Sequence, residues 1–203
     1  MKNVIYLASN SVSRKNLLLQ AKIHCEVIPQ TANESDVNVE QPLSDVVMQI
    51  AQLKMTHAVL PLGKSEGDVC FVLTADTMGL TKSGRLLTKP SDRSDAISML
   101  RDCRQGPQTT VTGFCLRKYQ WQQGAWQMMQ EESGFDKASM LFQVPESRMD
   151  FYLDNTPFLS VSGAVSIEHF GGQFCQSLNG SYEAIIGLPM FKIRQTLETL
   201  MFF

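Results

Sequence analysis

A carboxylate directly after a buried apolar run is the first sign of chemistry in this sequence. Residues 70–75 form a run in which Thr74 is the one polar side chain, and Asp76 follows it directly. The run predicts a buried strand, and α/β proteins often place catalytic groups at the carboxyl end of such a strand. A buried carboxylate needs a partner such as Lys54, Thr77 or a metal ion. Asp76 is therefore either a catalytic group or one half of a structural ion pair.

Lys54 interrupts the apolar stripe of a predicted helix over residues 44–60. The stripe includes Val47, Ile50 and Ala51, and helical spacing places Lys54 on the same face. That face should be buried. Two interpretations are open: the lysine extends to water along its own stem, or it points into a cleft that holds an anionic ligand.

A third candidate lies where a predicted strand over residues 4–8 runs into a helix. Ser9, Ser11 and Ser13 supply hydroxyl groups there, and Arg14 supplies a guanidinium group. The N-terminus of a helix offers free N–H groups and the positive end of a dipole, which suits a phosphate. Arginine also matches phosphate oxygens through paired hydrogen bonds. The alternative is an ordinary capped helix with a solvated Arg14.

Glu34, in a polar loop over residues 30–42, and Lys89, before Pro90, are unremarkable on their own. The sequence has no GxxxxGK[ST] loop, GxGxxG fingerprint or GxSxG elbow. The five cysteines include no CxxC pair, which argues against a structural zinc site. What remains is two carboxylates, three cations and a helix N-terminus. These groups suit the metal-assisted hydrolysis of a polyphosphate.

Composition limits the class of partner. The chain has 203 residues, a formal net charge of -2 and 43% hydrophobic residues, which fits one substantial globular domain. This charge argues against binding to a nucleic acid polymer or to an acidic membrane surface. The apolar run near the N-terminus is too short for a signal sequence, and no stretch approaches a membrane span. We therefore expect a cytoplasmic protein.

The order of predicted elements is mixed α/β. A turn is expected at residues 120–126, and Asn179–Gly180 predicts a tight hairpin between two strands. The predicted strands cover residues 4–8, 25–28, 70–75, 109–119, 160–167, 174–178 and 182–186. Helices are predicted from residue 12 past Leu19 and over residues 44–60, 92–104, 146–153 and 190–201.

Taken in order, these motifs resemble the Maf family of nucleotide pyrophosphatases, and they extend over nearly the whole chain. The matching positions are Leu7-Ala8-Ser9-x-Ser11-x-x-Arg14, Glu34, Lys54, Ala75-Asp76-Thr77, Lys89-Pro90, Thr112-Gly113, Gly163-Ala164, Ile167, Gly180-x-Tyr182 and Gly187-Leu188-Pro189.

The resemblance implies a single domain over residues 1–203, with two lobes around one cleft and a long twisted mixed sheet flanked by helices. It implies a homodimer that cleaves nucleoside triphosphates to the monophosphate and pyrophosphate with Mg²⁺ or Mn²⁺. Asp76 and Glu34 would bind the metal and act on the water, and Lys54 and Lys89 would complete the catalytic set. The residues that would contact the substrate are Ser9, Ser11, Ser13, Arg14, Thr77 and Glu168.

Some positions depart from the family pattern. Ser13 stands where many members have an arginine, and Gln108, Val161 and Val165 replace a histidine, a lysine and a tyrosine. At position 168 the pyrimidine-preferring branch typically has glutamine and the 7-methyl-GTP branch glutamate. An ionised Glu168 only accepts hydrogen bonds, so it suits the N1–H and amino group of a guanine. This slightly favours a 7-methyl-GTP-like purine over dTTP or UTP.

The drift at these recognition positions leaves a second hypothesis open. The chain would then be a catalytically weak nucleotide-binding protein that regulates cell division and septum formation through partners. Glu34, Lys54, Asp76 and Lys89 are all present, which favours the enzyme.

Overall fold

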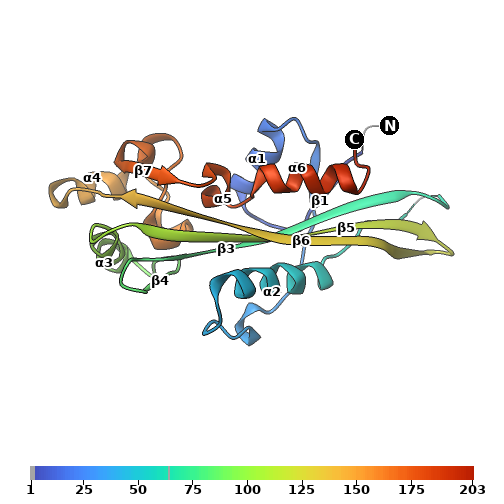
Figure 1. Cartoon of the computed structure of the whole chain (residues 1–203), viewed down its shortest axis with the longest axis horizontal. Coiled ribbons are helices and arrows are strands. Elements are labelled where there is room, and N and C mark those ends of the chain that lie inside the picture. The colour runs from blue at the N-terminus through green and yellow to red at the C-terminus, as the bar shows by residue number, and fades with distance from the viewer. Residues whose placement is uncertain (1–2, 64) are drawn as a thin grey trace. The chain divides into compact units, whose positions relative to one another are not determined.

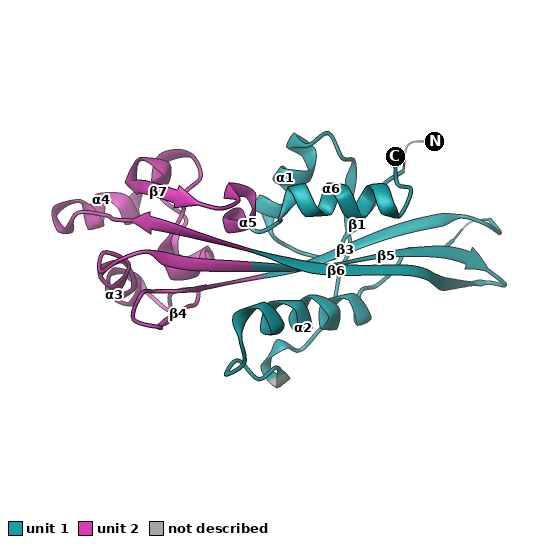
Figure 2. Ribbon diagram, in the orientation of Figure 1, with its two compact units in different colours: residues 1–76, 112–136, 187–203 teal, residues 77–111, 137–186 magenta. Residues whose placement is uncertain are grey.

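The computed structural model describes residues 3–63 and 65–203, with only the backbone at residue 36. The chain forms two compact units, each assembled from separate segments (Figure 2). Unit 1 contains residues 1–76, 112–136 and 187–203, and unit 2 contains residues 77–111 and 137–186. No described helix has the length and apolar character needed to cross a membrane. Location in the cytoplasm and the two lobes around one cleft stay predictions.

A mixed sheet of seven strands confirms the predicted α/β class (Figure 1). The order is β2-β1-β3-β5-β6-β7, and β4 pairs with β3 beside this path. Strand β1 pairs in parallel with both β2 and β3, whereas the β3–β4 and β6–β7 pairs are antiparallel. The strands are β1 (Ile5–Leu7), β2 (Cys25–Val27), β3 (Val69–Leu80), β4 (Leu86–Leu87), β5 (Gln108–Gln122), β6 (Ala125–Phe142) and β7 (Cys175–Asn179).

In unit 1, helices cover both faces of the strands. Helices α1 (Val12–Gln20) and α6 (Met190–Thr199) lie above them in Figure 1, and α2 (Leu43–Thr56) lies below. Ala51 and Met55 of α2 pack with Cys70, Val72 and Cys115 of the strands. Helix α2 is shorter than the predicted 44–60 and ends at Thr56. Residues 57–59 instead form backbone hydrogen bonds with residues 29–31.

Unit 2 has its own apolar core around Tyr152. The Tyr152 ring lies 5.7 Å from that of Phe142 and 5.2 Å from that of Phe174, measured between ring centroids. The Tyr152 hydroxyl donates to the carbonyl of Ala164 at 2.7 Å and accepts from the N–H of Ser166 at 2.9 Å. The helices of this unit are α3 (Arg93–Cys103), α4 (Met149–Asp154) and α5 (Tyr182–Ile186).

Short 3₁₀ turns replace the predicted strand over residues 160–167. They are η3 (Phe158–Ser160) and η4 (Ser162–Ala164); others are η1 (Glu34–Asp36), η2 (Glu146–Arg148) and η5 (His169–Phe174). Gly163 and Ala164 have φ angles of 66° and 57°. Such left-handed residues cannot continue an extended strand, so the strand prediction was wrong.

The predicted hairpin at Asn179–Gly180 was also wrong on its second side. Gly180 turns the chain with φ of 110°, but residues 182–186 form helix α5. Ser181 begins the helix, because its hydroxyl oxygen accepts a hydrogen bond from the N–H of Ala184 at 3.1 Å. At the other predicted turn, β5 ends at Gln122 and β6 begins at Ala125. The turn is therefore two residues long, and both of them, Gln123 and Gly124, have positive φ angles.

Candidate active site

The candidate site in unit 1 is centred on the ammonium group of Lys54. Helix α2 directs this side chain inward, and only 7% of the residue is exposed. Its Nζ atom lies 2.7 Å from Oδ1 of Asp76 and 3.0 Å from Oε1 of Glu34. The burial predicted from the apolar stripe is confirmed, and the lysine pairs with both predicted carboxylates.

Asp76 lies within β3 and not at its end, which corrects the sequence interpretation. Strand β3 continues to Leu80 because its last residues pair with β4, with Gly79 opposite Leu87. Asp76 is 9% exposed. Two residues earlier, the Thr74 hydroxyl donates to the carbonyl of Ala51 in α2 at 2.6 Å. This bond ties the strand that carries Asp76 to the helix that carries Lys54.

Glu34 reaches the site from the turn η1, and its side chain is 45% exposed. Nothing in the local sequence distinguishes Glu34, since a glutamate in a polar loop is ordinarily solvated. Because Glu34 is more exposed than Asp76, solvent reaches the cluster more easily from the Glu34 side.

Arg14 is buried, so the interpretation of a solvated arginine was wrong. Its Nη1 donates to Oγ of Ser9 at 3.1 Å, and its Nε donates to the carbonyl of Gly187 at 3.0 Å. Burial lowers the pKa of the guanidinium, and the negative charges of Asp76 and Glu34 oppose that shift. Arg14 therefore shares one electrostatic environment with the two carboxylates.

The N-terminus of α1 is capped as its sequence predicts. Ser11 is the N-cap, and its hydroxyl accepts from the N–H of Arg14 at 3.3 Å. Ser9 is 8% exposed and accepts from the N–H of Ser11 at 3.3 Å. Ser13 is half-buried in the first turn. The predicted combination of serine hydroxyls, arginine and helix N-terminus is thus present in unit 1.

The remaining predicted site residues belong to unit 2. Thr77 follows Asp76 in β3 and is half-buried, whereas Lys89 is exposed just after β4. Glu168 is half-buried and immediately precedes η5. Burial raises the pKa of Tyr182, and the negative charge of Glu168 raises it further. The roles of these three residues stay predictions.

Two contacts escaped sequence reasoning. The carbonyl of Gly187 accepts a hydrogen bond from Arg14, although the sequence pattern identifies Gly187 only as part of a motif. The second contact is the hydrogen bond from the Thr74 hydroxyl to α2. A signal for it existed, because Thr74 is the one polar residue in a buried run and a buried hydroxyl needs a partner.

The donor set fits a hard divalent cation. Asp76 and Glu34 both approach one nitrogen of Lys54, so their carboxylates lie close enough to share a cation. Among residues 3–63 and 65–203, no group of three or more His, Cys, Asp or Glu side chains is placed to hold a metal. Mg²⁺ is commonly held by one or two carboxylates together with substrate phosphates. Two carboxylates fit a metal that receives its other ligands from a nucleotide and water.

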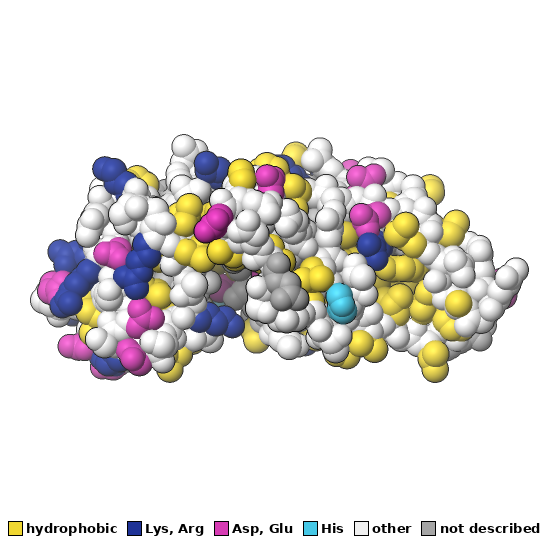
Figure 3. Space-filling view, turned by 90° about the horizontal axis from the view of Figure 1, so that it is seen from below, with side chains coloured by type: hydrophobic (Ala, Val, Ile, Leu, Met, Phe, Trp, Pro, Cys, Tyr) yellow, Lys and Arg dark blue, Asp and Glu magenta, His cyan; other side chains and the backbone are white. Residues whose placement is uncertain are grey.

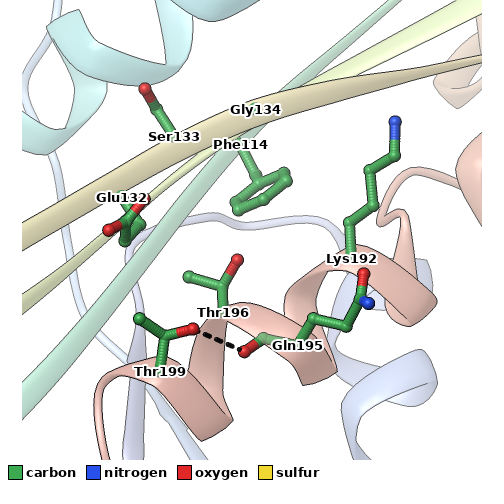
Figure 4. Close-up of a pocket in the computed structure, with 8 residues that line it drawn as sticks. All are labelled: Phe114, Glu132, Ser133, Gly134, Lys192, Gln195, Thr196 and Thr199. Carbon is green, nitrogen blue, oxygen red and sulfur yellow. Dashed lines mark hydrogen bonds between the residues drawn. The ribbon is translucent and has the colours of Figure 1, made fainter.

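A separate cavity of about 340 Å³ lies between α6 and strands β5 and β6 (Figure 4). Phe114, Lys192 and Gln195 contribute to its lining, and none of the predicted site residues does. Lys192 already donates to the carbonyl of Phe135 at 2.6 Å. This cavity provides no catalytic arrangement.

Comparison with known proteins settles the family. The family model described as Maf-like protein matches residues 4–200. The chain belongs to the Maf-like family. A dTTP/UTP pyrophosphatase of Bdellovibrio bacteriovorus is 29% identical over 98% of this chain and 99% of that protein. A nucleoside triphosphate pyrophosphatase of Chlamydia pneumoniae is 31% identical over 97% of this chain and 93% of its own length.

A further Maf-like relative, the dTTP/UTP pyrophosphatase of Citrifermentans bemidjiense, is 30% identical over 98% of this chain and 97% of its own length. Two of these three names specify pyrimidine substrates, and none names a methylated purine. The slight preference for 7-methyl-GTP drawn from Glu168 is therefore unsupported, and the names oppose it mildly.

Proposed function

We propose that this Maf-like protein is a nucleoside triphosphate pyrophosphatase that releases the monophosphate and pyrophosphate. The observation that carries the proposal is that the buried Lys54 pairs with both the buried Asp76 and the more exposed Glu34. Arg14 lies in the same electrostatic environment. The full-length match to a family whose relatives carry this activity in their names supports the same reaction.

In the proposed reaction, water attacks the α-phosphorus and negative charge develops on the departing pyrophosphate. Asp76 orients the water and accepts its proton, with Glu34 in support. Lys54, Lys89 and Arg14 stabilise the phosphate charge. The hydroxyls that add contacts to the substrate are those of Ser9, Ser11, Ser13 and Thr77. Mg²⁺ or Mn²⁺ held by Asp76 and Glu34 would supply Lewis acidity at the phosphate oxygens.

For the substrate we propose a pyrimidine nucleoside triphosphate such as dTTP or UTP. The names of the relatives support this choice. Glu168 then has a smaller role than in a guanine site. An ionised carboxylate can accept the single N3–H of uracil or thymine, but it offers no donor to the flanking carbonyls.

The test is pyrophosphate release from dTTP, UTP, CTP, GTP and 7-methyl-GTP, with Mg²⁺ and with Mn²⁺. Asp76→Asn should lower kcat by at least ~10²-fold, the low end for a lost general base. Asp150→Asn is the matched control, because Asp150 is an exposed carboxylate of unit 2 that pairs with Arg93. Near-normal kcat for Asp76→Asn would remove its assigned role. No turnover on any substrate, with nucleotide binding retained, would favour the regulatory alternative.

We also propose a homodimer, and the outer edge of β6 is the surface that favours it. Strand β7 pairs with β6 only from Ser139 to Phe142, so among the described residues no strand covers that edge from Ala125 to Ala138. Residues 125–130 carry no charge, and Met128 and Met129 are 55% and 50% exposed. A neutral, exposed edge readily pairs with another strand.

A second copy is the proposed occupant because antiparallel pairing centred on Met129 brings no acids together. Glu131 would lie opposite Gln127, and Glu132 opposite Trp126. Met129→Lys should shift the protein from dimer to monomer in sedimentation velocity, whereas Met201→Lys, a change at an exposed methionine outside β6, should not. A monomeric wild-type protein would refute the proposal.

A further inference from the structure

Lys54 already contacts one oxygen of each carboxylate that would hold the metal ion. Its Nζ is 2.7 Å from Asp76 and 3.0 Å from Glu34, the two residues assigned to the cation. The contact with Asp76 is a charge-assisted hydrogen bond, a type about twice as strong as a neutral one, and the contact with Glu34 is an ion pair. A divalent cation that uses these two oxygens, Oδ1 of Asp76 and Oε1 of Glu34, must therefore first displace this ammonium group.

Charge balance opposes the entry of a bare metal ion. Arg14 and Lys54 supply two positive charges, and Glu34 and Asp76 supply two negative ones. A divalent cation alone would create an excess of positive charge beside the buried cations Arg14 and Lys54, whose repulsion of it is poorly screened. A metal–triphosphate complex carries net negative charge, so its phosphate oxygens can balance both cations.

Of the two cations, Lys54 is the one able to move. The Arg14 guanidinium is held by Ser9 and by the backbone carbonyl of Gly187. The contacts of the Lys54 ammonium are with the carboxylates themselves, at the end of a flexible four-carbon stem. Displaced from the carboxylates, it can rotate its donors towards phosphate oxygens without any movement of α2.

We propose that Lys54 is an internal counter-ion that excludes a free metal ion, so that the metal is bound stably only together with the triphosphate. This inference rests on the proposed function, because it takes its substrate and metal from there. It gives Lys54 two sequential partners, the carboxylates before binding and the phosphates afterwards. The site would then bind the metal–nucleotide complex and not accumulate free cation.

The test measures Mn²⁺ binding without nucleotide, from the electron paramagnetic resonance signal of free Mn²⁺. Lys54→Met should bind Mn²⁺ at least ~10-fold more tightly than the wild type, because it removes both the competitor and its charge. Lys54→Arg should stay within about twofold of the wild type, because it keeps the charge. Mn²⁺ should also raise the Tm of Lys54→Met more than that of the wild type.

Lys118→Met is the matched control for a simple change of net charge. Lys118 belongs to unit 1, and its Nζ donates to the carbonyl of Leu200, so it is not part of the cluster. It should bind Mn²⁺ as weakly as the wild type. If it gained as much affinity as Lys54→Met, the effect would be general electrostatics and the inference would fail. Lys54→Gln replaces Lys54→Met if that variant does not fold.

A second measurement adds a non-hydrolysable α,β-imido analogue of dTTP. With the analogue present, the wild type should bind Mn²⁺ at least ~10-fold more tightly than is expected from the separate Mn²⁺ affinities of the analogue and of the protein. The analogue should increase the Mn²⁺ affinity of Lys54→Met by a smaller factor. Equal Mn²⁺ affinity of wild type and Lys54→Met without nucleotide would overturn the inference. The proposed hydrolase activity would still stand if the wild type hydrolysed dTTP. If the wild type did not hydrolyse dTTP, the proposed function would be refuted independently of this inference.

Discussion

Gly113 tests how closely the helix that carries Lys54 must approach the sheet. A Cβ atom added at Gly113 in β5 would lie 2.8 Å from the carbonyl carbon and oxygen of Val47 and 2.9 Å from the nitrogen of Met48. All three atoms are backbone atoms of α2, so no side-chain rotation can relieve the contact. Gly113→Ala must instead push α2 and β5 apart by roughly half an ångström, the overpacking case.

The expected cost has two parts. Overpacking of this kind typically destabilises a protein by about 1–3 kcal/mol, measurable as a lower urea midpoint with an unchanged m-value. The displacement should also loosen the contacts of Lys54 with Asp76 and Glu34, which are now 2.7 Å and 3.0 Å. Since a misplacement of 1 Å can cost about 10²-fold in rate, we expect kcat to fall on the order of tenfold.

Gly79→Ala in β3 is the matched control. Its new Cβ would lie 3.4 Å or more from its nearest neighbours, atoms of Leu87 and Thr109, which is ordinary van der Waals contact. It should change the free energy of unfolding by less than ~1 kcal/mol, since it introduces no clash. If Gly113→Ala matched Gly79→Ala in both urea midpoint and kcat, the tight contact between α2 and β5 would be refuted.

Two further predictions concern stability. Tyr152→Phe leaves the Ser166 N–H and the Ala164 carbonyl without their partner and should cost about 1–3 kcal/mol in urea unfolding; a loss no greater than that of Tyr119→Phe, whose hydroxyl accepts from Arg117, would contradict it. Burial also raises the pKa of three thiols from 9.0 to about 12 in the folded state. The unfolded chain therefore loses these protons first, and the urea midpoint should fall as the pH rises from about 9 to 12; replacing the three thiols together with alanine should flatten that fall, and an unaltered slope would refute the assignment. The thiols are Cys70, Cys103 and Cys115.

The parts of the site that the sequence could predict are those set by local periodicity. The apolar neighbours of Lys54 recur at helical spacing, which predicts a buried face, and Lys54 is 7% exposed. Ser11 is one of the serines that the pattern predicts at the start of α1, and it caps that helix. In both cases the determining interactions are within a few residues of the chain, so local sequence contains the information.

The errors arise where distant pairing or a single cap overrides local preference. The apolar run before Asp76 predicted a strand end, but the strand extends because its last residues pair with β4. Residues 182–186 include two isoleucines, which favour a strand, yet the Ser181 hydroxyl caps a helix there. A strand preference from two side chains is easily outweighed by one hydrogen bond that satisfies a backbone N–H group.

Glu34 shows why the complete cluster could not be derived from local pattern. Its loop is polar, and nothing within it distinguishes a paired carboxylate from a solvated one. Two backbone hydrogen bonds hold the loop just before Glu34. The N–H of Thr31 donates to the carbonyl of His57 at 3.2 Å, and the N–H of Val59 donates to the carbonyl of Pro29 at 2.9 Å. These bonds fix the start of the loop against the end of α2, the helix that carries Lys54. The position of the second carboxylate therefore depends on a pairing between segments about thirty residues apart, which local pattern does not predict; only the resemblance of the ordered motifs to a family singles out Glu34.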